Sequence, residues 1–207
     1  PIVFLREGRS TTVTLRRRPG GLGLYNDTRP ESGFGSGEPG FGPELALLGS
    51  LPALFAERTE RAMIVGLGGG HSTQIVLAGG FDRVDVVELE PAVVEAARLM
   101  YEARDTPFPL DDRRARLVID DARNRLVLAE PGSYDAIVSQ PSHPWLAGSS
   151  ALYTREFFAE VDRALADDGV FALWLNLFRT DIEAIRAVLR TLTGAFPRVQ
   201  GFIAENT

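Results

Sequence analysis

Apolar and polar residues follow two different patterns along the chain. Up to about residue 29, short β-prone runs are separated by Glu-Gly and Pro-Gly-Gly turns, which predicts a small antiparallel sheet. Beyond residue 43, short apolar runs alternate with stretches in which apolar residues recur every three or four positions. The expected strands of the first part are 2–5, 11–15 and 22–25.

The second part reads as repeated strand and helix units. Such units with short apolar strands predict an α/β fold, in which helices cover both faces of a parallel sheet. Ligands of these folds bind outside the carboxyl ends of the strands. The expected helices are 43–55, 72–78, 91–101, a short one after Asp121, 154–165 and one over 182–192, and the expected strands are 62–65, 84–88, 115–119, 136–139, 170–175 and 199–203.

Three regions follow from this reading. Residues 1–29 form a small β-cap, residues 30–43 a linker or lid with five glycines and three prolines, and residues 44–207 the α/β domain. Phe34 and Phe41 could let the second region close over a ligand. Because the chain begins at Pro1 inside an expected strand, we expect it to be a fragment of a longer protein.

Composition removes several classes of enzyme. The chain has no cysteine, and all 22 of its basic residues are arginine, which excludes thiolate chemistry, Schiff-base lysines and P-loops. The two histidines, His71 and His143, cannot build a three-histidine metal site, so no metal is expected. A net charge of -6 argues against a nucleic-acid partner. The longest apolar run, 169–178, is far shorter than the roughly 20 residues that span a bilayer.

The run Gly66-Leu67-Gly68-Gly69-Gly70-His71 follows an expected strand and opens a helix. Glycines at such a turn let a ligand approach the backbone. The third glycine of a dinucleotide fingerprint would fall on His71, which disfavours NAD. The run therefore predicts a nucleoside-binding loop.

Two acidic residues end the next two strands. Glu88 lies 22 residues after Gly66, at the spacing where a carboxylate meets ribose hydroxyls. Asp121 could accept a hydrogen bond from an adenine amine or could cap the following helix. Together with the glycine loop, these residues predict a site for an adenosine moiety without a second nucleotide.

Four segments carry a family resemblance: AMIVGLGGGHSTQIVLAGG, VDVVELEPAVVEAARLM, RLVIDDARNRL and YDAIVSQPSHPWLAGSSALYTREFF. They resemble the spermidine synthase family of aminopropyltransferases, whose fold is similar to class I S-adenosylmethionine methyltransferases. The last segment is closest to a bacterial branch fused to transmembrane, major-facilitator-like segments. The resemblance covers nearly the whole chain, and it implies that residues 44–207 form a Rossmann-like nucleoside-binding domain.

The resemblance implies a role for each matching residue. It assigns Glu88 to the donor's ribose, Asp121 to adenine, and Gly66, Gly68 and Gly70 to the loop near the sulfonium. It also exposes departures, since Gly69 replaces an aspartate that holds the donor's amine, and Gln140 and His143 replace two aspartates after the fourth strand of the parallel sheet. The residues expected to bind the donor's nucleoside are therefore kept, whereas those expected to bind the acceptor are changed.

The changed acceptor residues limit which groups can orient or deprotonate the acceptor amine. Gln140 can orient an amine but cannot take its proton, whereas His143 could act as a base or hold a proline-flanked loop by hydrogen bonds. Tyr153, Ser139 and Ser142 could supply further hydrogen bonds. His71 is expected to pack or cap the glycine loop.

The main functional hypothesis is aminopropyl transfer to an amine, with S-adenosylmethionine or its decarboxylated form as donor and a polyamine as acceptor. Methyl transfer, sulfonium cleavage that releases methylthioadenosine, and a non-catalytic nucleoside sensor are the alternatives. The resemblance also implies a cytoplasmic-facing soluble domain tethered to the bacterial inner membrane, with transmembrane segments in the full-length chain. A homo-oligomer is left as an alternative to a monomer.

Overall fold

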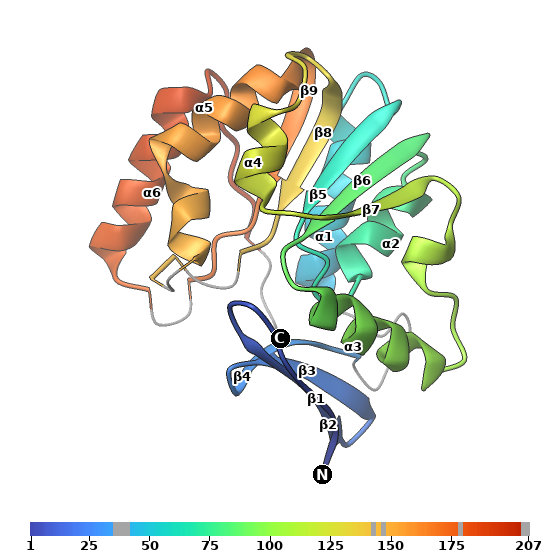
Figure 1. Cartoon of the computed structure of the whole chain (residues 1–207). Coiled ribbons are helices and arrows are strands. Elements are labelled where there is room, and N and C mark those ends of the chain that lie inside the picture. Colours follow the sequence, from blue (N-terminus) through green and yellow to red (C-terminus); the bar gives the residue numbers. More distant parts are fainter. Residues whose placement is uncertain (35–41, 142–143, 146–147, 178–179, 204–207) are drawn as a thin grey trace.

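The computed structural model describes residues 1–34, 42–141, 144–145, 148–177 and 180–203. An antiparallel sheet of four strands opens the chain, in the order β1-β2-β3-β4. This sheet, which we call the β-cap, lies against one end of the rest of the molecule (Figure 1). Its strands are β1 (Ile2–Glu7), β2 (Thr12–Arg18), β3 (Gly21–Asn26) and β4 (Arg29–Gly33).

The second sheet is parallel and has five strands in the order β7-β6-β5-β8-β9. The chain reverses its direction of travel across the sheet after β7, so that β5 and β8 are neighbours at the centre. This is the topological switch point where α/β sheets hold their ligands. The strands are β5 (Arg61–Val65), β6 (Arg83–Glu88), β7 (Ala115–Ile119), β8 (Tyr134–Ser139) and β9 (Leu165–Leu173).

Helices cover both faces of the parallel sheet. On one face, α1 (Pro43–Phe55), α2 (His71–Ala78) and α3 (Pro91–Glu102) pack on side chains such as Ile64 and Val86. On the other, α4 (Ala122–Val127), α5 (Arg155–Ala164) and α6 (Ile182–Ala195) pack on Met63 and Ile137. Two short 3₁₀ turns lie at Pro109–Asp111 and Ser149–Tyr153. This confirms the predicted α/β fold with an N-terminal antiparallel β-cap.

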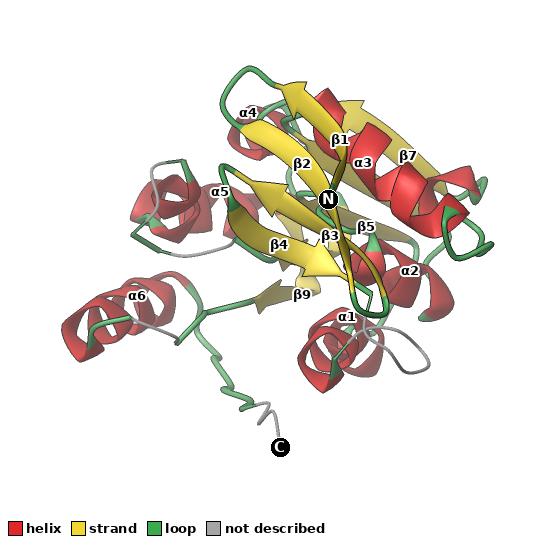
Figure 2. Ribbon diagram, turned by 90° about the horizontal axis from the view of Figure 1, so that it is seen from below, coloured by secondary structure: helices red, strands yellow, loops and turns green. Residues whose placement is uncertain are grey.

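The β-cap is fixed to the parallel domain through α3. Val13, Leu15 and Leu24 form one buried cluster with residues of α3 that include Val93 and Met100. Figure 2 shows the four strands lying in front of the parallel sheet when the molecule is seen from below. This arrangement places the turns of the β-cap next to the loops at the carboxyl ends of β5 and β6.

Two expectations about strands were wrong. The segment 30–43, expected as a linker, begins with β4, which pairs with β3 and tolerates Pro30 because an edge strand can lack an N–H donor. Residues 199–203, expected as a strand, belong to no sheet, and Val199, Phe202 and Ile203 are exposed. Residues 35–41 of the expected linker, with Phe41, lie outside the described residues, and its last residue, Pro43, begins α1.

Candidate functional site

A cavity of about 1420 Å³ lies where the carboxyl ends of the parallel strands face the β-cap. The glycine loop after β5, Glu88 at the end of β6, Asp121 after β7 and Gln140 after β8 all line it. The structure therefore brings together donor residues that the sequence suggested, from three separate strand ends, and Gln140 of the expected acceptor side from a fourth.

The glycine loop has the backbone that its glycines permit. Gly66, Gly68 and Gly70 have φ values of 83°, 52° and 83°, in the left-handed region where a side chain is strained. Gly66, Gly68 and Gly69 line the cavity. Gly70 is the N-cap of α2 and does not line the cavity. No side chain caps α2.

Glu88 is buried and holds the loop in place. Its Oε2 accepts a hydrogen bond from the Leu67 backbone N–H at 2.8 Å, and its Oε1 accepts one from the Glu90 N–H at 2.9 Å. Burial raises the pKa of Glu88, while the backbone N–H donors around it act in the opposite direction. These donors are the backbone N–H groups of Glu90, Leu67, Gly68 and Leu89. Acceptance of ribose hydroxyls by the same carboxylate stays a prediction.

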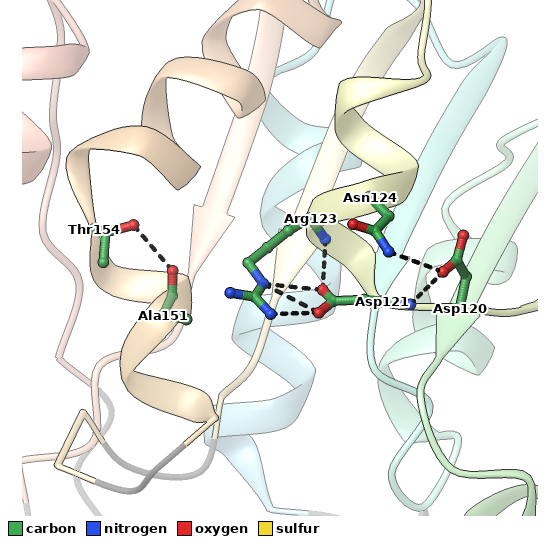
Figure 3. Close-up of polar contacts among 6 residues, drawn as sticks. All are labelled: Asp120, Asp121, Arg123, Asn124, Ala151 and Thr154. Carbon is green, nitrogen blue, oxygen red and sulfur yellow. Dashed lines mark hydrogen bonds and ion pairs between the residues drawn. The ribbon is translucent and has the colours of Figure 1, made fainter.

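Asp121 caps α4 and forms an ion pair beside the cavity (Figure 3). Its Oδ1 accepts from the Arg123 backbone N–H at 2.9 Å and from Arg123 Nε at 3.1 Å. The Arg123 side chain lowers the pKa of Asp121 below its ordinary value. Of the two roles that sequence left open, the capping role is present, and adenine contact stays a prediction.

Gln140 faces the cavity from the end of β8. Its Oε1 accepts a hydrogen bond from Ser72 Oγ at 2.9 Å, which joins the end of β8 to the first turn of α2. With Oε1 engaged in this way, the Nε2 group of Gln140 is the part that can donate to a ligand. Gln140 is therefore a hydrogen-bond donor at this end of the cavity.

Tyr153 lies outside the cavity wall. Its hydroxyl donates to the Trp174 carbonyl oxygen at 3.1 Å, with the Pro141 carbonyl oxygen at 3.5 Å, and burial raises its pKa. The side chain thus ties the loop after β8 to the loop after β9. Ser139, also proposed for the acceptor site, is fully buried and does not line the cavity. His143 and Ser142 lie outside the described residues.

Two contacts from the β-cap complete the site and were not visible in the sequence. Glu90, buried just after Glu88, accepts hydrogen bonds from the Arg9 and Ser10 backbone N–H groups at 3.0 and 2.6 Å. Ser32 of β4 lines the cavity and packs against Gly69. These pairs are too far apart in sequence for any local motif to reveal them.

His71 is a packing residue of the loop. It is 3% exposed, and its ring lies 4.8 Å from that of Phe34, edge to face. Burial lowers the pKa of His71 to about 4, so the imidazole is neutral at pH 7.

The described part of the chain holds no group of three His, Cys, Asp or Glu side chains placed to bind a metal ion. None of its helices is both long enough and apolar enough to cross a membrane.

Fold and site together define a Rossmann-like α/β domain whose cavity lies at the carboxyl edge of a parallel sheet and is closed by a β-cap. A family model described as the spermine/spermidine synthase domain matches residues 44–205. The chain belongs to this family.

Curated relatives agree with this family. The chain is 29% identical to the polyamine aminopropyltransferase of Mycobacterium tuberculosis over 207 residues, covering 94% of this chain and 36% of the relative. It is 29% identical to putrescine N-methyltransferase 1 of Nicotiana tabacum over 136 residues, covering 63% of this chain and 34% of the relative. The chain therefore spans only about a third of the length of these two proteins.

Solved structures share the fold. A spermidine synthase in complex with the transition-state analogue AdoDATO superimposes with a TM-score of 0.84 and 21% identity, covering 95% of this chain and 66% of that one. The spermidine synthase of Thermotoga maritima superimposes with a TM-score of 0.80 and 20% identity, covering 95% and 65%.

Proposed function

We propose that this domain transfers an aminopropyl group from decarboxylated S-adenosylmethionine to an amine, with a polyamine such as putrescine as acceptor. The observation that carries the proposal is the meeting of the glycine loop, Glu88 and Asp121 in one cavity. Membership of the spermine/spermidine synthase family supports it. The donor's adenine would lie over the end of β7, its ribose over β6 and its sulfonium over β5.

The reaction is a displacement at carbon. The acceptor nitrogen attacks the CH₂ bonded to the sulfonium, the carbon–sulfur bond breaks, and its electron pair returns to sulfur to give methylthioadenosine. The nitrogen then loses one proton. Because the leaving group is already activated, alignment of a neutral amine is the main task of the protein.

Several described residues contribute to binding and aligning the two substrates. Glu88 fixes the ribose and the glycine loop, and Gln140 offers an amide donor near the reacting centre. Tyr153 positions the loops after β8 and β9 but, with its hydroxyl directed to carbonyl oxygens, it is not the proton acceptor in this mechanism. His143 stays our candidate for the base.

One incubation tests the proposal. The protein is mixed with putrescine and each donor in turn, and the products are read by mass spectrometry. Equal amounts of methylthioadenosine and aminopropylated putrescine support the proposal. Transfer through His143 should rise through a pKa near 6.5 and collapse in His143→Ala. Absence of any donor turnover would overturn aminopropyl transfer.

Methyl transfer is the second candidate. Similarity to a putrescine N-methyltransferase favours it. Its product would be adenosylhomocysteine. Methylthioadenosine without an aminopropylated amine would indicate sulfonium cleavage, and binding without turnover would indicate a nucleoside sensor.

Membrane attachment and assembly are separate proposals. The resemblance of residues 134–158 to a branch with transmembrane segments supports a tether at the bacterial inner membrane. Recovery of the full-length protein in the membrane fraction would support it, and recovery in the soluble fraction would count against it. Light scattering would distinguish a homo-oligomer from a monomer.

A further inference from the structure

β7 forms one edge of the parallel sheet. Among the strands that the structure describes, it pairs with β6 alone, at the opposite end of the sheet from β9. The N–H of Asp120, just after β7, donates to the Glu88 carbonyl oxygen on β6. Because backbone groups alternate in direction along a strand, the N–H and C=O groups of Leu117 and Ile119 point away from β6. Such an edge is a template for another strand.

The two faces of β7 carry different side chains. Leu117 and Ile119 lie on one face and are 37% and 41% exposed, although both are apolar. Arg116, Val118 and Asp120 lie on the other face, where Val118 packs against the core cluster that α4 and α5 cover. Among the described residues, neither Arg116 nor Asp120 takes part in an ion pair. The edge thus combines an exposed apolar pair with two opposite charges four residues apart.

This spacing is complementary to itself in an antiparallel pair of β7 strands. When Val118 lies opposite Val118 of a second copy, Leu117 exchanges both of its outward backbone hydrogen bonds with Ile119 of that copy. Arg116 then lies directly opposite Asp120 of the second copy, and the two-fold symmetry repeats both pairs. Side chains that are directly opposite interact, and opposite charges there are favourable.

Neighbouring registers lose this agreement. With Leu117 opposite Leu117, Arg116 faces Val118 and has no charged partner. With Ile119 opposite Ile119, Asp120 faces Val118 instead. A shift by one residue sets outward backbone groups against inward ones. A charge on an edge strand hinders pairing when nothing neutralises it, so the register with two charge pairs is favoured.

We propose that β7 is an interaction surface for a second copy of this chain, and that the two parallel sheets join there through antiparallel β7 strands. The apolar pair is then covered, and each Arg116 faces Asp120 of the other copy. Asp120 also lines the cavity, where its Oδ1 accepts the Asp121 N–H at 2.7 Å. The contact therefore adjoins the cavity, but the proposal does not depend on the transfer reaction.

Sedimentation velocity over roughly 1–200 µM measures the association. Wild type should dimerise with a Kd on the order of 10 µM, because the contact is small. Arg116→Asp and Asp120→Arg each set like charges opposite one another twice, and each should raise Kd at least about tenfold. Arg190→Asp is the matched control, since it makes the same charge change on α6, on the other side of the molecule from β7 (Figure 1). It should keep the wild-type Kd.

A mixture of the two variants tests the register. A pair of one Arg116→Asp chain with one Asp120→Arg chain has opposite charges at both positions again. The mixture should therefore dimerise with a Kd within about threefold of wild type, although each variant alone does not. Circular dichroism checks that both variants fold. A mixture of folded variants that stays monomeric would overturn the proposed register.

Hydrogen exchange of wild type locates the contact without any variant. The backbone amides of Leu117 and Ile119 should exchange about fivefold more slowly at roughly 200 µM than at roughly 1 µM, because the dimer pairs them. A dimer whose amides there exchange equally fast at both concentrations would show association through another surface, such as the β-cap, and would contradict the proposal. A monomer at every concentration would contradict it too, as would wild-type dimerisation of Arg116→Asp.

Discussion

Arg123 binds the carboxylate of Asp121 through its backbone N–H and its guanidinium, immediately beside the cavity. The side chains of this ion pair are 53% and 25% exposed, so the pair itself contributes little to stability. Its importance lies in its position. If the Asp121 carboxylate accepts a hydrogen bond from the adenine amine, Arg123 competes with the ligand for the same oxygens.

Arg123→Ala should therefore strengthen binding of methylthioadenosine by about 1 kcal/mol, roughly fivefold. Methylthioinosine, which carries an oxygen in place of the amine, should gain nothing. Calorimetry with both nucleosides measures the difference.

Arg98→Ala is the matched control, because Arg98 pairs with Asp111 on the surface and neither residue lines the cavity. It should change neither affinity. Equal gains for both nucleosides in Arg123→Ala would show that Asp121 does not read the amine.

Glu90 fastens the β-cap to the donor site. Burial alone would raise its pKa, but the hydrogen bonds from Ser10 and Arg9 hold the pKa of Glu90 below its ordinary value. Glu90→Ala should destabilise the fold by about 1–3 kcal/mol, because two backbone N–H groups lose their acceptor. Hydrogen exchange of the Arg9 and Ser10 backbone amides should be faster in Glu90→Ala than in wild type.

Glu95→Gln serves as the control for Glu90. Glu95 also joins α3 to the β-cap, through Arg6, but both side chains are at least half exposed. Its loss should change stability by no more than about 0.5 kcal/mol. Similar exchange rates in both variants would argue against Glu90 as the anchor.

Asp85 supports the other end of β6. It is fully buried, and it accepts hydrogen bonds from Arg61 Nη2 at 2.6 Å and from the Tyr134 hydroxyl at 3.0 Å. Asp85→Asn should cost about 3–5 kcal/mol in urea unfolding, the usual result of breaking a buried pair. A loss below about 1 kcal/mol would contradict this role.

The sequence predicted those parts of the fold that local pattern determines. Parallel strands such as β5 and β8 contain the short apolar runs 62–65 and 136–138, and α3 begins at Pro91 with a strong helical period. β4 was missed because Arg29–Gly33 contains Pro and Gly, and only its pairing with β3 makes it a strand. The run 199–203 has strand-forming residues but no pairing partner among the described strands.

The same distinction applies to the site. The glycine loop, Glu88 and Asp121 stand at predictable places, the ends of successive strands. The partners of Gly69 and Glu90 could not be predicted, because Ser32 and Ser10 reach them from a separate sheet. The side-chain hydrogen bond from Ser72 to Gln140 likewise depends on how α2 meets β8.

His71 gives the fold a pH dependence of known sign. Burial lowers its pKa to about 4 in the folded protein, against an ordinary value of 6.5. The unfolded chain therefore binds a proton at a higher pH than the folded one. The contribution is complete above pH 6.5 and is lost as pH falls toward 4, with a total on the order of 3 kcal/mol.

Urea unfolding of wild type and His71→Gln at pH 7.5 and 4.5 measures this contribution. Carboxylates also titrate in this range, so the quantity of interest is the difference between the two proteins. Wild type should lose more stability than His71→Gln. An equal loss in both proteins would mean that His71 is not held neutral by the fold.

The assignment of this cavity to a nucleoside donor depends on the ribose contact of Glu88, which calorimetry of methylthioadenosine measures. Glu88→Gln should weaken binding by about 1.5–3 kcal/mol, because an amide cannot accept both ribose hydroxyls as a carboxylate does. Glu95→Gln makes the same chemical change at a half-exposed residue that does not line the cavity, and should leave the affinity unchanged. Wild-type affinity in a folded Glu88→Gln variant would contradict the assignment of this cavity to a nucleoside donor.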